Sequence, residues 1–456
     1  MRYEPNPARA CLLTGLRGLN ASPWLEFAGR FDPVSRDDPG CAGGFAEARA
    51  DSTAKGFLGN AYAEYRKSRP TRIREVGLSA FLVLLITAGL SASGAVILSG
   101  NESKIDLTSG APRVLRDAPA DSISILDFST FPPAVEHISG VANSVIGPPS
   151  NIAITPDGRL ALIANSLKVE PAWQTNWVPE NFIHLFDLTS KPPRVIGRVT
   201  SGVQPSGISI RRDGKLALVA NRGDGSISVL ALDGQRATAL QSVTICSAAD
   251  SVSDVAIAPD GKLVLASVQK AGYLAVLFLE GNALAATGQK LSVYGQPYRC
   301  VITPDGELGL TAGQGFGNGL DHDALTVIDL KAKPMRSTGY VPLGAVPESF
   351  EINADGSLLA AVLMNGSNLP SGDPNYSTHG ELVLLRRDGK TYRLVQRHRV
   401  GRIPEGVAFT SDGKHLVVQC HPDRELWIFA MKRGRATDTG HRIKVPGMPS
   451  SLRASP

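Results

Sequence analysis

Cysteine, aromatic residues and net charge are all scarce in this sequence of 456 residues. Its five cysteines include no CxxC pair and no even set, which excludes a zinc knuckle and a disulfide framework. Aromatic residues make up only 6% of the chain, so it has few of the side chains that stack on bases or sugars. The 47 basic and 42 acidic residues leave a formal charge of +5, too small an excess for a typical nucleic-acid-binding protein. The chain does contain 47 glycines and 31 prolines, which predict frequent turns and short elements.

A single long apolar run extends from Val76 to Leu90. Small residues follow it as far as Ala95, and a basic cluster precedes it: Arg66, Lys67, Arg69, Arg72 and Arg74. A basic segment, a short apolar core and a small-residue exit are the three parts of a secretory signal peptide. We therefore expect cleavage after Ala95 and a periplasmic or secreted location. If the run extends to Ser99 it becomes long enough for a single-span anchor, which would leave the rest of the chain membrane-anchored outside the cytoplasm.

Residues 1–65 show neither helical nor strand periodicity and no repeat. They form either a cytoplasmic or regulatory domain or an extension produced by an over-extended gene start, and we favour the extension. The predicted organisation is thus an unstructured or mis-assigned extension over 1–65, a signal or anchor over 66–95, and one folded domain over 96–456.

Six similar blocks repeat through this domain, each with an alternating apolar segment, an Asp-Gly pair and a second apolar segment. The pairs are Asp157-Gly158, Asp213-Gly214, Asp260-Gly261, Asp305-Gly306, Asp355-Gly356 and Asp412-Gly413. Asp-Gly supplies the positive φ of tight hairpin turns, so each block predicts a β-hairpin. A third strand follows in each unit, for example SISVLAL from Ser226, and then a shorter fourth such as RVIGRVT before Ser201. Four strands in every repeat with no helical period predict an all-β propeller of four-stranded blades.

A seventh blade is predicted from the two ends of the domain. The segment from Gly447 copies the start of a unit but lacks the later strands. AVILSG from Ala95 is similar to a second strand, and SISILDF from Ser122 to a third. Pairing these segments would close the ring and remove a free sheet edge.

The repeat pattern resembles the YVTN-repeat group of seven-bladed β-propellers. The resemblance is carried by P-x-G-[IV]-x-[IV]-x-P-D-G, by endings such as ALIAN and ALVAN, and by a following [IV]-S-V-[LI]-D, and it covers residues 96–456. It implies a seven-bladed propeller. Members of this group include exported binding proteins, and related propellers include lactone hydrolases and quinoprotein dehydrogenase subunits.

The loops from second to third strands share one rim with the loops that precede each first strand. Unequal loop lengths on this rim indicate a binding face. Candidate ligand-binding side chains there are Trp173 and Trp177 in 165–181, Arg222 in 221–225, Asn365 and His379 in 365–380, and His421 in 420–424. The loop 313–323 contributes His322 as a candidate catalytic residue. The alternative is loop drift under weak constraint.

Glu348 and Glu405 occupy equivalent positions before the first strands of two units, where side chains project toward the channel mouth. They are candidates for acid–base catalysis or cation binding. Arg299 is a candidate partner for a substrate carboxylate or phosphate. The alternative is that these residues line a wet pore. Three rim histidines could converge on a metal, but no local ligand spacing supports this and no metal site is expected.

These observations predict an exported propeller that binds a small polar ligand or a partner protein on its rim. The first alternative is a lactone-type hydrolase in which Glu348 or Glu405 activates water, and the second is a redox-enzyme subunit, although the chain has no CxxCH haem motif. Whether the chain is an enzyme stays open, and no cofactor is identified. No nucleic-acid partner is expected, and a membrane is expected only through the run from Val76 to Leu90.

Overall fold

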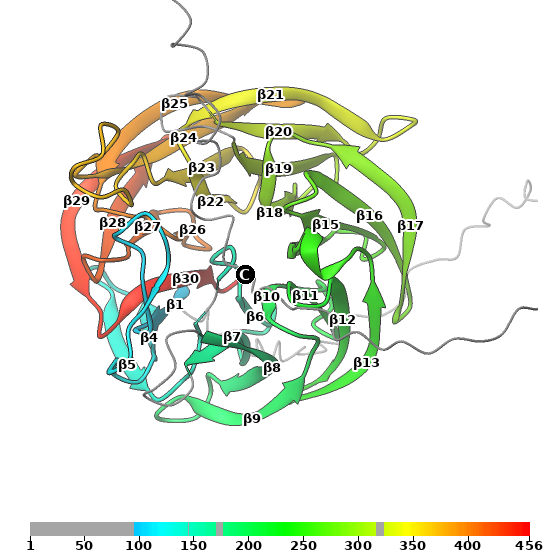
Figure 1. The fold of residues 1–456 in the computed structure, drawn as a ribbon, viewed down its shortest axis with the longest axis horizontal. Helices are drawn as coiled ribbons and strands as arrows, with labels where there is room; N and C mark the ends of the chain where they lie inside the picture. Colours follow the sequence, from blue (N-terminus) through cyan, green and yellow to red (C-terminus); the bar gives the residue numbers. More distant parts are fainter. Residues whose placement is uncertain (1–94, 145, 170–176, 316–322) are drawn as a thin grey trace, which may run out of the picture. The chain divides into compact units, whose positions relative to one another are not determined.

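The computed structural model describes residues 95–144, 146–169, 177–315 and 323–456, and these residues form seven four-stranded antiparallel sheets arranged as blades around a central channel (Figure 1). The predicted all-β seven-bladed propeller with four-stranded blades is confirmed. The predicted signal or anchor, the extension 1–65, and the candidates Trp173 and His322 lie outside the described residues. Within the described part of the chain, no helix has the length and apolar character needed to cross a membrane.

Six blades follow one another along the chain, each with its first strand innermost. Blade 1 contains β6 (Ile152–Ile154), β7 (Leu160–Val169), β8 (Trp177–Asp187) and β9 (Arg194–Thr200). Blade 2 contains β10 (Pro205–Ile210), β11 (Leu216–Asn221), β12 (Ser226–Asp233) and β13 (Arg236–Thr244). Blade 3 contains β14 (Val252–Ile257), β15 (Leu263–Val268), β16 (Tyr273–Glu280) and β17 (Ala283–Ser292), after a short 3₁₀ turn, η2 (Ala248–Asp250).

The next three blades repeat the same order. Blade 4 contains β18 (Gln296–Ile302), β19 (Leu308–Gln314), β20 (Asp323–Asp329) and β21 (Arg336–Gly344). Blade 5 contains β22 (Pro347–Ile352), β23 (Leu358–Leu363), β24 (Gly380–Asp388) and β25 (Thr391–Val400). Blade 6 contains β26 (Val407–Phe409), β27 (His415–Cys420), β28 (Glu425–Lys432) and β29 (Arg435–Lys444).

Blade 7 is assembled from both ends of the described chain. Its strand order is β30 (Met448–Ala454), β1 (Val96–Glu102), β4 (Ser122–Asp127) and β5 (Ala134–Ser139). β1 and β30 are antiparallel, with Ile97 opposite Ala454. A small hairpin, β2 (Ile105–Asp106) and β3 (Arg113–Val114), is inserted between β1 and β4. All seven sheets are therefore built from residues 95–456.

The Asp-Gly turns fold as hairpin turns because both residues meet a local requirement. All six glycines have φ between 67° and 71°, the left-handed region that glycine tolerates best. The aspartate accepts from the backbone two residues later, as in Arg159 N to Asp157 Oδ1 at 3.1 Å. In blade 1 the Thr155 hydroxyl also donates to this carboxylate at 2.6 Å. Each turn therefore fixes the residues at which its second strand begins and ends.

The hydrophobic core lies between neighbouring blades. Leu218 and Val229 of blade 2 belong to one buried cluster with Val255 and Leu277 of blade 3. The same kind of cluster joins blades 6 and 7, and includes Ile97, Leu126, Val417, Ile428 and Leu452. The ring is thus packed all the way round by residues of the described domain, which supplies the burial needed for independent folding.

Candidate functional site

Two sets of side chains surround the channel mouth at the end opposite the Asp-Gly turns. The first set, the inner ring, stands at the beginning of the first strands: Ser150, Ser206, Ser253, Tyr298, Glu348, Glu405 and Ser450. The second set, the outer ring, stands at the ends of the second strands: Glu102, Ser166, Arg222, Gln269, Gln314, Met364 and His421. The acidic members of both rings come from blades 5, 6 and 7, and Arg222 comes from blade 2. Charge is therefore distributed unevenly around the mouth.

Backbone hydrogen bonds fix the two rings against each other. The N–H groups of Arg222, Met364 and His421 donate to the carbonyls of Gln204, Val346 and Ile403 at 2.9, 2.9 and 3.1 Å. The three accepting residues have φ of 58°, 54° and 45°.

Such left-handed backbone is unfavourable for β-branched residues such as Val346 and Ile403, costing about 1–3 kcal/mol each. Each of these two residues precedes a proline and then Glu348 or Glu405. The strained positions therefore directly support the two glutamates, as is common at functional sites.

A small cavity of about 30 Å³ lies at the mouth. Its polar lining includes Glu102, Tyr298, Glu348, Glu405, His421 and Ser450. Its size is enough for about one water molecule. Five ionisable side chains from four blades thus meet around a space with room for about one water molecule.

An apolar cap covers this cavity. Ile105 and Leu107, from the β2–β3 insertion, pack against Leu167, Met364 and Ile403 in one buried cluster. Trp177 lies at the margin of the same cluster. As a result Glu348 is only 4% exposed and Glu405 only 5% exposed.

Burial controls the protonation of the two central glutamates. Glu348 accepts hydrogen bonds from Gln314 Nε2, at 2.9 Å, and from the Tyr298 hydroxyl. Burial nevertheless raises the pKa of Glu348 to about 8, against the opposing effects of these bonds and of Arg222. Glu405 Oε1 has no hydrogen-bond partner among the described residues. Burial, followed by the charges of Glu348 and Glu102, raises the pKa of Glu405 well above its usual range.

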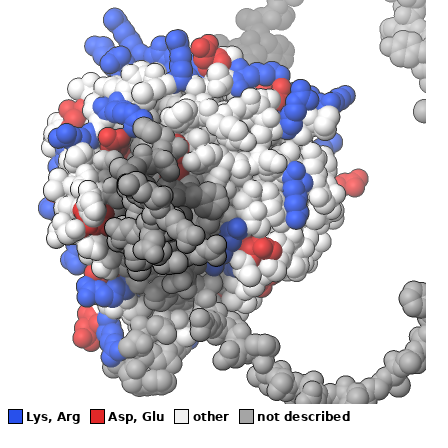
Figure 2. All heavy atoms as spheres, turned by 45° about the horizontal axis from the view of Figure 1, so that its top comes forward, with Lys and Arg blue, Asp and Glu red and all other residues white. Residues whose placement is uncertain are grey.

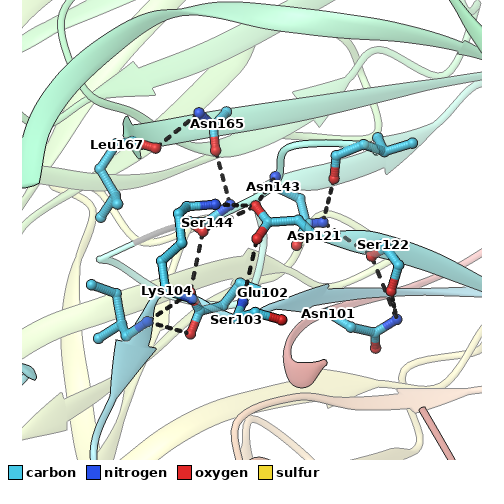
Figure 3. A network of polar contacts seen from close by, with 12 residues as sticks. Asn101, Glu102, Ser103, Lys104, Asp121, Ser122, Asn143, Ser144, Asn165 and Leu167 are labelled. Carbon is cyan, nitrogen blue, oxygen red and sulfur yellow. Dashed lines mark hydrogen bonds and ion pairs between the residues drawn. The ribbon is translucent and has the colours of Figure 1, made fainter. Parts of the chain in front are cut away.

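Glu102 belongs to a polar network that ties the base of the cap to blades 7 and 1 (Figure 3). Its carboxyl accepts from the backbone N–H of Lys104 at 2.9 Å, and Lys104 Nζ pairs with Asp121. The Ser144 hydroxyl lies 3.2 Å from both Glu102 Oε2 and Asp121 Oδ2. One hydroxyl proton can serve only one carboxylate at a time. Burial and then the charge of Asp121 raise the pKa of Glu102 to about 8. A protonated Glu102 can therefore donate the second hydrogen bond, which the Ser144 hydroxyl cannot supply.

Arg222 and His421 complete the site with unsatisfied nitrogen atoms. Arg222 Nη2 donates to Gln269 at 2.7 Å, while its buried Nη1 has no partner among the described residues. His421 Nδ1 lies 3.3 Å from the Pro449 carbonyl, and its buried Nε2 lies 4.0 Å from Glu102 Oε1. Burial lowers the pKa of His421 to about 4, so the imidazole is neutral at physiological pH. The mouth therefore offers a cationic donor, a neutral imidazole and protonated carboxyl groups.

The structure places three of the residues predicted from the sequence around this cavity, namely Glu348, Glu405 and His421. Arg222 lies outside the cavity lining, near Tyr298 and Glu348. Arg299 is not among the three. It lies deeper in the channel, where its Nη2 is 2.6 Å from Glu351 Oε2, and Arg453 Nη1 contacts the same oxygen at 3.1 Å. The interpretation of Arg299 as a free partner for a substrate anion was wrong because an internal carboxylate already neutralises it.

The other predicted rim residues do not line the cavity. Trp177 is the first residue of β8 and packs under the cap, so its assignment to a rim loop was wrong. Asn365 is half-buried with φ of 50° and shapes a turn. His379 lies 3.3 Å from the Ser377 hydroxyl within its own loop. Among the described residues, no group of three or more His, Cys, Asp or Glu side chains could hold a metal ion.

Sequence reasoning missed Glu102, Gln269 and Gln314 as members of the site. A signal for most of the outer ring was present. In blades 1 to 6 the outer-ring residue follows the turn aspartate by nine positions, as Arg222 follows Asp213. Glu102 lacks this marker because no Asp-Gly turn connects its strand to β30.

A family model described as lactonase, 7-bladed beta-propeller, matches residues 149–301 of this chain. The matched segment covers the first three blades, and the structure supplies the remaining four. Over these residues the chain is similar to that family, and its structure is a seven-bladed propeller.

Solved structures show that the likeness in fold extends over the whole ring. A 6-phosphogluconolactonase candidate from Bacteroides fragilis has a TM-score of 0.60 at 17% identity, covering 80% of this chain and 99% of its own. The periplasmic gluconolactonase of Pseudomonas aeruginosa has a TM-score of 0.55 at 18% identity, covering 79% and 99%. Kuenenia stuttgartiensis hydrazine synthase has a TM-score of 0.53 at 16% identity, covering 69% and 91%. At these identities the likeness concerns the fold. The comparison with curated proteins found no match.

Proposed function

We propose that this lactonase-like propeller hydrolyses a lactone at the channel mouth. The observation that carries the proposal is the meeting of Glu348 and Glu405 at one cavity in unlike environments. Glu348 is hydrogen-bonded by two donors that favour its ionised form, whereas Glu405 has an unpaired oxygen and two acidic neighbours. Two neighbouring carboxyl groups with raised pKa values, one hydrogen-bonded by donors and the other not, are suited to act as base and acid.

In the proposed reaction Glu348, once ionised, takes a proton from water as the water oxygen bonds to the acyl carbon. Arg222 Nη1 is the unpaired donor that stabilises the resulting oxyanion. The ring C–O bond then breaks, and protonated Glu405 gives its proton to the ring oxygen. The product is a hydroxy acid, and proton release to solvent accompanies its ionisation. No atom or electron from another reactant is needed.

Substrate access requires the cap to move. The cavity of about 30 Å³ holds a water but not a lactone ring. Ile105 and Leu107 come from a two-stranded hairpin with two residues in each strand, which makes the β2–β3 insertion the least supported part of the enclosure. Its displacement would open the mouth while leaving the blades intact.

The small closed cavity also favours a second candidate function, the binding of a small polar ligand without turnover. The same donors and acids would then serve recognition alone. In either case we propose that the domain works outside the cytoplasm, because the basic and apolar segments before Ala95 have the pattern of an export signal.

The proposal is tested by proton release from a panel of lactones, using purified residues 95–456. We expect turnover in the parent protein and a loss of about 100-fold or more in Glu348→Gln and Glu405→Gln. Glu381→Gln is the matched control, because Glu381 is a rim glutamate paired with Arg397 at 2.8 Å and lies outside the cavity. A folded parent protein that turns over no lactone would overturn the hydrolase proposal and leave the binding candidate.

A further inference from the structure

Basic side chains gather on one edge of the propeller, remote from the channel mouth. The turns that join third to fourth strands lie at the same end as the Asp-Gly turns, as shown by the bond from Leu330 N to Glu307 O at 2.9 Å. The turns of blades 4, 5 and 6 contain ten Lys or Arg and two Asp, in residues 327–338, 386–393 and 430–437.

The equivalent turns of the other four blades lack this excess. Together these four turns contain three Lys or Arg and five Asp or Glu, in residues 125–136, 185–196, 231–238 and 278–285. A domain with nearly balanced charge thus concentrates its positive charge on three consecutive blades. Figure 2 shows Lys and Arg side chains gathered along the upper border of the view, with few acidic ones among them. We call the turns of blades 4 to 6 the basic edge.

Contacts join the three turns of the basic edge into one surface. Lys390 of blade 5 reaches Asp329 of blade 4 at 2.7 Å. Arg386 of blade 5 donates to the carbonyl of Arg433 in blade 6 at 3.2 Å. These bonds hold the neighbouring turns together despite the repulsion between their like charges.

Most of the charge on the basic edge is exposed and not neutralised. Six exposed side chains form no ion pair among the described residues: Lys331, Lys333, Arg336, Lys432, Arg433 and Arg435. Two large apolar side chains on the adjoining outer strands are also exposed, Tyr340 at 54% and Leu394 at 50%. Cations beside exposed aromatic and aliphatic groups suit a surface that is charged outside and apolar beneath.

The chain enters the domain at this same end. Ala95 accepts a hydrogen bond from Phe128 N, at the third-to-fourth-strand turn of blade 7. Only five residues, 91–95, separate β1 from the apolar run that ends at Leu90. The first strand of the described domain therefore begins at the end that carries the basic edge.

We propose that the basic edge docks on an anionic phospholipid bilayer, with the channel mouth directed away from it. The charge of the edge, its exposed apolar neighbours and the place where the chain enters all fit this one partner. Because the edge and the channel mouth lie at opposite ends, docking leaves the candidate site open to solvent.

The test is co-sedimentation of residues 95–456 with phosphatidylcholine vesicles prepared with and without phosphatidylglycerol. We expect binding only to the anionic vesicles, weakening as salt is raised. The triple variant Lys432→Glu, Arg433→Glu, Arg435→Glu should lower the partition coefficient by about tenfold or more. A Gln version of the same triple serves if charge reversal impairs folding, which thermal unfolding would reveal.

The matched control reverses three exposed cations on the equivalent turns of blades 1 and 2: Lys191→Glu, Arg194→Glu and Arg236→Glu. It changes net charge equally and should keep binding within about twofold of the parent. The proposal would be overturned by equal losses of binding in both triple variants, by equal binding to neutral and anionic vesicles, or by no binding to either kind of vesicle. Tighter binding to duplex DNA than to anionic vesicles would overturn it too, and would assign the edge to a nucleic acid. Lactone turnover should not change in either triple, so the result stands apart from the hydrolase test.

Discussion

Gln314 donates a 2.9 Å hydrogen bond to Glu348 and so connects the outer ring of the channel mouth to the inner ring. Glu348 comes from the strained start of β22 in blade 5, and Gln314 from the end of β19 in blade 4. Because an amide donor stabilises the ionised carboxylate, this contact opposes the burial that raises the pKa of Glu348. The bond therefore lowers the pH at which Glu348 can act as a base, although burial is the larger influence.

Replacing Gln314 with Met should raise the pKa of Glu348 further above 8, since the donor is lost and burial remains. If Glu348 is the base, the rate of lactone hydrolysis rises with pH through this pKa, and its midpoint moves upward in the variant. The measurement is a pH–rate profile of kcat/KM. Gln396→Met, which removes a bond to the Ala436 backbone between outer strands, is the control and should leave the midpoint in place.

Stability should fall as pH rises above neutrality. Glu102 and Glu348 each have a pKa near 8 in the folded protein against 4.5 as the ordinary value, so the folded state binds more protons between these limits. The unfolding free energy then decreases with rising pH, by about 2 kcal/mol per group between pH 6.5 and 8. His421 acts in the opposite sense, but only between its folded pKa of about 4 and its usual 6.5. Urea unfolding at several pH values checks this.

Glu348→Gln should flatten the same pH dependence, because the amide does not titrate. Glu381→Gln, on the rim but outside the cavity, should leave the slope unchanged. An unfolding free energy that stays constant or rises between pH 6.5 and about 9 would contradict the protonation states assigned to the mouth.

Truncating the cap should cost stability and expose the acids. Leu107 is 8% exposed within the cap cluster, so Leu107→Ala is expected to lower the unfolding free energy by about 2 kcal/mol. Leu240→Ala removes an equal volume from an outer-strand side chain that is 47% exposed, and should change stability by about 0.5 kcal/mol or less. Only Leu107→Ala should move the pH–rate midpoint downward, since water then reaches Glu348. An unmoved midpoint would argue that the cap does not control burial of the acids.

The Arg299–Glu351–Arg453 network should be structural. Glu351→Gln leaves two guanidinium groups without their shared carboxylate and should destabilise the domain by about 3 kcal/mol. Adding Arg453→Gln removes one unpaired charge, so the double variant should cost less than the sum of the two single variants. A double-mutant cycle from chemical denaturation measures this coupling. A purely additive result would show that the three side chains act independently.

The sequence by itself determined the repeat and hence the blade. Alternating apolar residues around each Asp-Gly pair require a hairpin, because glycine accepts the positive φ of the turn and period-two alternation suits a strand. The third strand β12, for example, begins at the predicted residue Ser226. These features depend on neighbours along the chain, which a repeat makes visible.

Tertiary structure alone decided the chemistry of the mouth. Tyr298, Glu348 and Glu102 lie far apart in the sequence and meet because blades 4, 5 and 7 turn the same strand ends toward one axis. Whether an arginine is free or neutralised also depends on other blades: Glu351 of the neighbouring blade pairs with Arg299, while Arg222 Nη1 has no partner among the described residues. The cap was equally hidden from sequence, since a short insertion after β1 buries the acids only when blades 1, 5 and 6 supply its apolar contacts. Local periodicity encodes the strands, but burial and charge pairing arise from contacts across the ring.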